Sequence, residues 1–128
     1  MSRTLSPIVM EHFMHPRNSR SLDRPSGEGW SGSQQTSRYM RVQVCVDDGH
    51  VTEASFATYG CAPAIAAGSF LTDWTLGRTV AEALQTRADW LRQQLGGLPT
   101  ARAYCADLAV DALHAAVRLA TKEEGGSA

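Results

Sequence analysis

The chain is organised around one stretch near its middle, Thr58-Tyr59-Gly60-Cys61-Ala62-Pro63-Ala64-Ile65-Ala66-Ala67-Gly68. An alternating, β-branched segment precedes it, and an Ala-rich apolar segment with helical spacing follows it. Gly60 permits a sharp turn between the two segments. Pro63 suits the first turn of a helix, where the N–H that proline lacks has no partner. The stretch therefore predicts a strand-to-helix turn that places Cys61 at a helix N-terminus.

Two readings of Cys61 are open at this position. The free N–H groups and positive end of a helix lower the pKa of a thiol and favour the thiolate, which binds metals and attacks sulfur. Alternatively, Cys61 is a small buried hydrophobe. Cys105 is expected at the start of the last helix, and two cysteines in this setting favour chemistry over packing. Cys45 falls on the polar face of a predicted strand, and we interpret it as a bystander thiol.

The composition indicates one globular domain over 1–128. Its 128 residues are 43% hydrophobic and 20% charged, which is ordinary for a soluble protein with its own core. The net charge of −1 gives no electrostatic case for nucleic acid or an anionic membrane as a partner, and no apolar run approaches membrane-spanning length. The start of the sequence has no signal-peptide pattern, so we expect a cytoplasmic location with cysteines that are free thiols, ligands or redox groups.

The order of the predicted elements indicates an α+β fold, in which a small antiparallel sheet packs against several helices. Alternation over 39–47 and 50–59, with Asp48-Gly49 between, predicts a hairpin. The Ser-, Gly- and Pro-rich stretch 16–37 predicts a flexible loop, in which Trp30 packs on the core. Helical patterns occupy about 7–15, 62–77, 80–84 and 90–95, and a last one runs from about 101 or 103 to about 121; 122–128 is predicted to be a frayed tail.

Collinear motifs along the chain resemble those of the IscU/NifU N-terminal scaffold family. They are His12-Phe13-x-x-Pro16-Arg17-Asn18, Val46-Asp47-Asp48-Gly49, Thr58-Tyr59-Gly60-Cys61-Ala62-x-Ala64-Ile65-Ala66, Leu98-Pro99 and Cys105-Ala106-x-Leu108-Ala109-x-Asp111-Ala112. The resemblance implies an α+β fold and a scaffold or carrier protein rather than an enzyme. Family members receive sulfur from a cysteine desulfurase as a persulfide, combine it with iron, and pass the iron–sulfur cluster to a recipient protein.

The same resemblance shows where this chain departs from the family. Members usually present three cysteines, with a glycine and then an aspartate after the first and often a histidine before the last. Cys61 and Cys105 match the second and third cysteines, which implies that they bind the cluster or its metal. The first cysteine is replaced by Thr36 and the glycine by Ser37. The aspartate is replaced by Arg38 and the histidine by Tyr104.

These departures disfavour zinc at the site. A tetrahedral zinc or a cluster takes four donors, and this chain offers two thiolates. Arg38 cannot ligate, and its fixed charge repels a bare divalent cation; two unit charges ~4 Å apart interact by roughly 4 kcal/mol at an effective dielectric of about 20. The same charge stabilises an anionic guest, such as a persulfide or a thiolate-ligated cluster.

Three functions follow from this ligand set. In the first, two chains each contribute Cys61 and Cys105 to one cluster that bridges a homodimer. In the second, the chain binds a desulfurase or another partner as a sulfur acceptor or regulator, with Cys105 taking the persulfide and no cluster assembled. In the third, the two thiols form a redox pair, which requires their Cα atoms to lie within about 7 Å.

Overall fold

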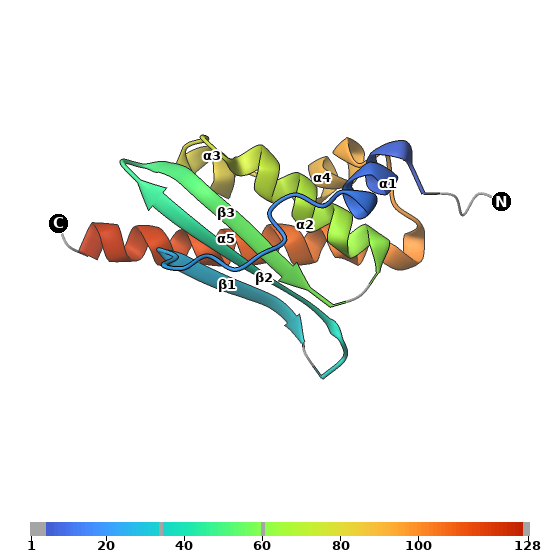
Figure 1. Ribbon diagram of the computed structural model, residues 1–128, viewed down its shortest axis with the longest axis horizontal. Helices are drawn as coiled ribbons and strands as arrows, with labels where there is room; N and C mark the ends of the chain where they lie inside the picture. The colour runs from blue at the N-terminus through green and yellow to red at the C-terminus, as the bar shows by residue number, and fades with distance from the viewer. Residues whose placement is uncertain (1–4, 34, 60, 127–128) are drawn as a thin grey trace.

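A three-stranded antiparallel sheet with helices packed against it forms the fold of this protein (Figure 1). The computed structural model describes residues 5–33, 35–59 and 61–126. The strands are β1 (Gly27–Ser33), β2 (Arg38–Asp47) and β3 (His50–Thr58), in that order across the sheet. The helices are α1 (Pro7–Met14), α2 (Ala62–Thr75), α3 (Val80–Leu84), α4 (Ala88–Gln94) and α5 (Tyr104–Gly126). The predicted α+β class is confirmed.

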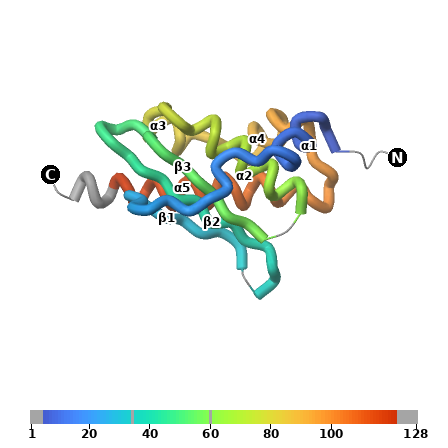
Figure 2. Tube along the Cα trace, in the orientation of Figure 1, coloured from blue at the N-terminus to red at the C-terminus, as the bar shows by residue number. Residues whose placement is uncertain are grey.

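The hairpin of β2 and β3 forms as its alternating pattern predicts. Met40, Val42 and Val44 of β2 are buried, and Asp48-Gly49 forms the turn with φ values of 53° and 74°. These positive angles match the right-handed twist of the strands that the turn joins. Helix α5 packs against β1 and β2, and α2 packs against β3. Figure 2 shows that the first turns of α2 and α5 lie at the same end of the molecule, close to α1.

The prediction of a loop over the whole of 16–37 is wrong, because Gly27–Ser33 forms β1 and pairs with β2. Glycine has a low propensity for strands, so the composition of 27–33 does not indicate that β1 forms there. The glycines are required by packing. A Cβ atom at Gly27 would collide with the carbonyl oxygen of Ala116, and one at Gly29 with that of Ala112, so α5 lies directly on the β1 backbone.

The expectation that Trp30 packs on the core is also wrong. Because Gly27 and Gly29 face α5, the alternation of the strand turns Trp30 to the other face of the sheet, where it is 48% exposed. Its ring lies 5.9 Å from that of Tyr39, and the Tyr39 ring stacks at 6.4 Å on that of Tyr59.

The part of the predicted loop that precedes β1, residues 16–26, has no regular secondary structure but is hydrogen-bonded to the sheet. It passes in front of the strands in Figure 1, on the face opposite α5. The Phe56 N–H donates to the Asn18 carbonyl at 3.0 Å, and the Leu22 N–H donates to the Gln43 side chain at 2.8 Å.

The last helix was expected to end near residue 121, whereas α5 continues to Gly126. Residues 127 and 128 of the predicted tail lie outside the described residues. Within the part of the chain that the structure describes, we find no helix with the length and apolar character needed to span a bilayer.

Candidate functional site

Cys61 is the N-cap residue of α2, as the central stretch predicts. It has extended backbone angles (φ −88°, ψ 166°), and Pro63 lies in the first turn that follows. Its carbonyl oxygen accepts hydrogen bonds from the N–H groups of Ala64 and Ile65, both at 3.1 Å. The helix therefore starts on the Cys61 backbone and leaves the partly exposed thiol free to react.

Cys105 lies in the first turn of α5, and its thiol faces that of Cys61. The two Sγ atoms are 3.8 Å apart, although the residues are 44 positions apart in sequence. Both are free thiols; Cys61 is partly exposed, whereas Cys105 has no exposed surface. Two helix N-termini thus converge on one pair of sulfur atoms with unequal access to solvent.

The electrostatics of Cys105 differ from the sequence-based expectation. Burial, followed by the charge of Cys61, raises the pKa of its thiol to about 12. Hydrogen bonding by Tyr104 and the charge of Arg102 act in the opposite direction but are outweighed. The predicted lowering of the pKa at a helix N-terminus is therefore wrong for Cys105. Desolvation destabilises the thiolate by more than the helix dipole stabilises it.

Arg38 and Tyr104 come together beside the thiols. The Arg38 guanidinium lies over the Tyr104 ring, with 5.0 Å between Cζ and the ring centroid. Burial and the charges of the two cysteines raise the pKa of Tyr104, so its hydroxyl stays neutral. A neutral phenol and a guanidinium are not metal ligands, and the fixed charge of Arg38 lies over the ring of Tyr104, the residue that precedes Cys105.

Thr36 lies in the turn between β1 and β2 and is engaged locally. Its hydroxyl donates to the Ser33 carbonyl at 3.1 Å. The next residue, Ser37, has a left-handed φ of 59°, at a position where the family resemblance implies glycine. The turn therefore has a backbone that suits glycine, although this chain has neither the glycine nor the cysteine that the resemblance implies here.

The described residues 5–33, 35–59 and 61–126 include no cluster of three or more His, Cys, Asp or Glu side chains that could hold a metal ion. Cys45 does not join the pair: it lies on β2 opposite Glu53, with its thiol 3.5 Å from the Arg24 carbonyl. One chain therefore presents two thiol donors at this site.

Arg92 is a residue that sequence reasoning missed. From α4 its Nη1 atom donates to the Ala103 carbonyl and to the Asp107 carboxylate, each at 3.1 Å. These bonds hold the start of α5, and with it Cys105, against α4. They also occupy Asp107, the carboxylate nearest to Cys105 in sequence. No local signal identifies Arg92, because its partners are close only in the folded chain.

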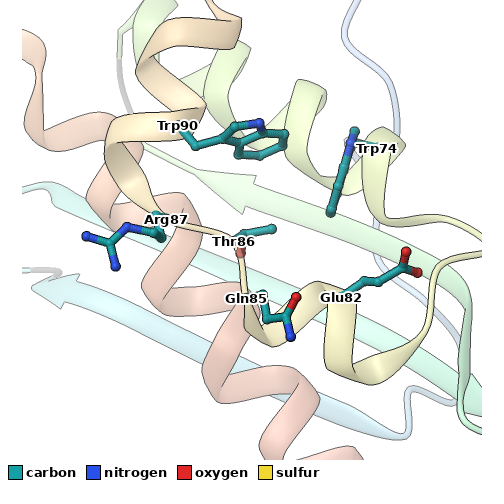
Figure 3. Close-up of a pocket in the computed structure, with 6 residues that line it drawn as sticks. All are labelled: Trp74, Glu82, Gln85, Thr86, Arg87 and Trp90. Atoms are coloured by element: carbon teal, nitrogen blue, oxygen red, sulfur yellow. The ribbon is translucent and has the colours of Figure 1, made fainter.

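A cavity of about 360 Å³ lies elsewhere, at the end of α2 opposite Cys61 (Figure 3). The Trp74 and Trp90 rings meet there edge to face at 4.9 Å. The Glu82 carboxylate is already bound to the N–H of Thr79 in the cap of α3. The residues that line the cavity are Trp74, Glu82, Gln85, Thr86, Arg87 and Trp90, none of which is a thiol.

Comparison with known families identifies this arrangement. Residues 5–124 match the family model described as the NifU-like N-terminal domain. This chain belongs to that family. The resemblance found in the sequence is therefore confirmed.

The relatives of this NifU-like domain include named scaffold proteins. The chain is 37% identical over 112 residues to iron-sulfur cluster assembly scaffold protein IscU 1 of Archaeoglobus fulgidus, covering 88% of this chain and 73% of the relative. It is 39% identical over 117 residues to the scaffold protein IscU of Azotobacter vinelandii, covering 88% and 91%. The solved NifU-like N-terminal domain from Brucella abortus superposes with a TM-score of 0.73 at 18% identity, covering 92% and 94%, and shares the fold.

Proposed function

We propose that this protein is an iron–sulfur cluster assembly scaffold or carrier that holds its cargo through Cys61 and Cys105. The observation that carries the proposal is the 3.8 Å contact between the two Sγ atoms at the starts of two helices. A cysteine desulfurase as sulfur donor and cluster-recipient proteins as partners follow from the family. The names of the relatives, which are scaffold proteins, support the same role.

The number of donors supports a second copy of the chain as the source of the remaining ligands. Iron–sulfur clusters are held by four protein ligands, mostly thiolates. One chain supplies two, so two chains together supply four to a single bridging cluster. Arg38 and Tyr104 contribute charge rather than ligation. The guanidinium favours a thiolate-ligated cluster, which carries net negative charge, over a bare zinc ion.

Anaerobic reconstitution with iron and inorganic sulfide tests this proposal. We expect a visible chromophore and, by native mass spectrometry, one cluster per two chains. Cys61→Ala and Cys105→Ala should each abolish the chromophore, whereas Cys45→Ala, the matched control, should retain it. A chromophore retained in either of the first two variants, or one carried by a single chain, would overturn the bridging site.

Sulfur acceptance without cluster assembly is the second candidate, and the unequal burial of the two thiols favours it. From the sequence, Cys105 is the residue expected to take the persulfide. Its buried thiol is shielded from a donor protein, so the partly exposed Cys61 is the better acceptor. A chain that stays colourless in the reconstitution but gains one sulfur atom on Cys61 from a cysteine desulfurase and cysteine would establish this role instead.

A further inference from the structure

We propose that the cysteine pair also performs a reaction: Cys61 accepts a persulfide sulfur, and Cys105 then displaces that sulfur as sulfide by forming a Cys61–Cys105 disulfide. This inference rests on the proposed role of the two cysteines in binding sulfur, and it adds the step that converts the delivered sulfur into the form that iron requires.

The division of roles follows from burial and distance. Cys61 is partly exposed and can exchange sulfur with a donor on another molecule, whereas Cys105 has no exposed surface. The thiol of Cys105 can react only with a group that is already inside the site. Its Sγ lies 3.8 Å from that of Cys61, so attack on a Cys61 persulfide is intramolecular.

The chemistry balances in three steps. A donor persulfide, R–S–SH, transfers its outer sulfur to Cys61, leaving R–SH and a Cys61 persulfide. The Cys105 sulfur then attacks the Cys61 sulfur, the bond between the Cys61 sulfur and the outer sulfur breaks, and H₂S leaves with the proton that Cys105 carried. The outer sulfur gains two electrons, and the two cysteine sulfurs lose two in forming the disulfide. A dithiol, small or protein-borne, then reduces the disulfide and restores both thiols.

The surroundings of the thiols suit this order of events. Cys105 has no exposed surface, whereas Cys61 is partly exposed, so a donor on another molecule reaches Cys61 and not Cys105. Cys105 gives up its proton as it attacks, because the thiolate is the nucleophile, and the departing sulfur takes that proton and leaves as H₂S.

The same two thiols cannot be ligands and a disulfide at once. Each sulfur released as sulfide therefore oxidises the site, and the chain binds iron again only after the dithiol has acted. A scaffold of this kind needs a dithiol for every sulfur atom it delivers, even when iron and the sulfur donor are abundant.

The test omits iron and the desulfurase. Reduced protein carrying Cys45→Ala, which removes the third thiol, is mixed anaerobically with one equivalent of glutathione persulfide. Free sulfide is trapped and quantified, and intact mass is followed in time. We expect a transient gain of one sulfur atom on Cys61, then about one sulfide per chain and a loss of two hydrogen atoms as the disulfide forms. Added dithiol should allow a second round.

Three variants assign the steps. In Cys105→Ala and Cys105→Ser, both checked for native circular dichroism, the sulfur atom should remain on Cys61 and sulfide release should fall at least about tenfold, because no neighbouring thiol is left to displace it. In Cys61→Ala, Cys105 should gain no sulfur. A stable persulfide in the protein with both thiols, equal release from the Cys105 variants, or sulfur found first on Cys105 would each overturn the inference.

Failure of this reaction can be separated from failure of the proposed scaffold function. Reconstitution uses inorganic sulfide and needs no persulfide, so a cluster that forms while sulfide release does not occur refutes only the present inference. Sulfide release without cluster formation refutes the bridging site and leaves the sulfur acceptor role in place.

Discussion

The Arg38 guanidinium lies 5.0 Å from the centroid of the Tyr104 ring. These are the two positions at which the family resemblance implies an aspartate and a histidine. The two replacements contact each other across β2 and the start of α5, as a cation and an aromatic ring commonly do. By the family resemblance, this pair stands where two potential metal ligands are expected, and we predict that it disfavours a bare metal cation at the site.

Reversing the charge at Arg38 should change the metal preference of the site. Arg38→Asp replaces a repulsive cation by an oxygen donor, and combined with Thr36→Cys it restores two of the missing ligand types. We expect zinc affinity to rise by at least about tenfold in the double variant, in line with loss of a repulsion worth a few kcal/mol. Competition against a chromophoric zinc chelator measures this change.

A remote substitution with the same change in charge provides the control for that experiment. Arg118 is exposed on α5, 14 residues beyond Tyr104 and so about 20 Å along the helix. Arg118→Asp should leave zinc affinity unchanged. Tight zinc binding by the unmodified protein would contradict our account of Arg38.

Much of the fold could be predicted from local sequence, and β1 shows where local sequence fails. Asp48-Gly49 encodes its turn directly, since both residues adopt the positive φ values that the turn requires. Gly27 and Gly29 instead serve a contact with a helix more than 80 residues away, and the same glycines make the segment resemble a loop. A strand defined by what packs on it cannot be identified from its own composition.

The site shows the same limit. The placement of Cys61 and Cys105 at two helix starts could be predicted from the sequence, and the structure confirms it. Their 3.8 Å contact and the complete burial of Cys105 depend on how α2 and α5 pack, which no local pattern encodes. For that reason the expected direction of the Cys105 pKa shift was wrong. The effect of the helix dipole follows from the position of Cys105 in its own helix, whereas its desolvation depends on tertiary packing.

The close packing of α5 on β1 predicts that a single methyl group added to the strand will strongly destabilise the fold. Gly29→Ala would place a Cβ atom against the carbonyl oxygen of Ala112, so α5 must move away from the strand. We expect a loss of about 3 kcal/mol in the free energy of unfolding, measured by urea titration. Trp30→Ala, on the exposed face of the same strand, should cost about 1 kcal/mol or less. Equal losses would show that α5 does not approach β1 as closely as described.

The turn before β2 predicts a stabilising substitution. Ser37 has a φ of 59°, which costs a residue with a Cβ atom about 1 kcal/mol relative to glycine. Ser37→Gly should therefore raise the free energy of unfolding by roughly that amount in a urea titration. Ser19→Gly is the control, because Ser19 is exposed and has an ordinary negative φ, and it should be neutral or slightly destabilising. Destabilisation by Ser37→Gly would argue against the left-handed turn.

The buried thiol predicts how stability depends on alkaline pH. Folding raises the pKa of Cys105 from 9.0 to about 12, so between these values the folded chain retains a proton that the unfolded chain releases. The stabilising contribution of the neutral thiol is complete below pH 9 and is lost as the pH rises toward 12. This loss adds at most about 1.4 kcal/mol per pH unit to the fall in the free energy of unfolding. Cys105→Ala should remove that part of the slope in urea titrations between about pH 8 and pH 11, whereas Cys45→Ala should keep it. Parallel slopes in the two variants would mean that burial does not hold the Cys105 thiol neutral in the folded chain.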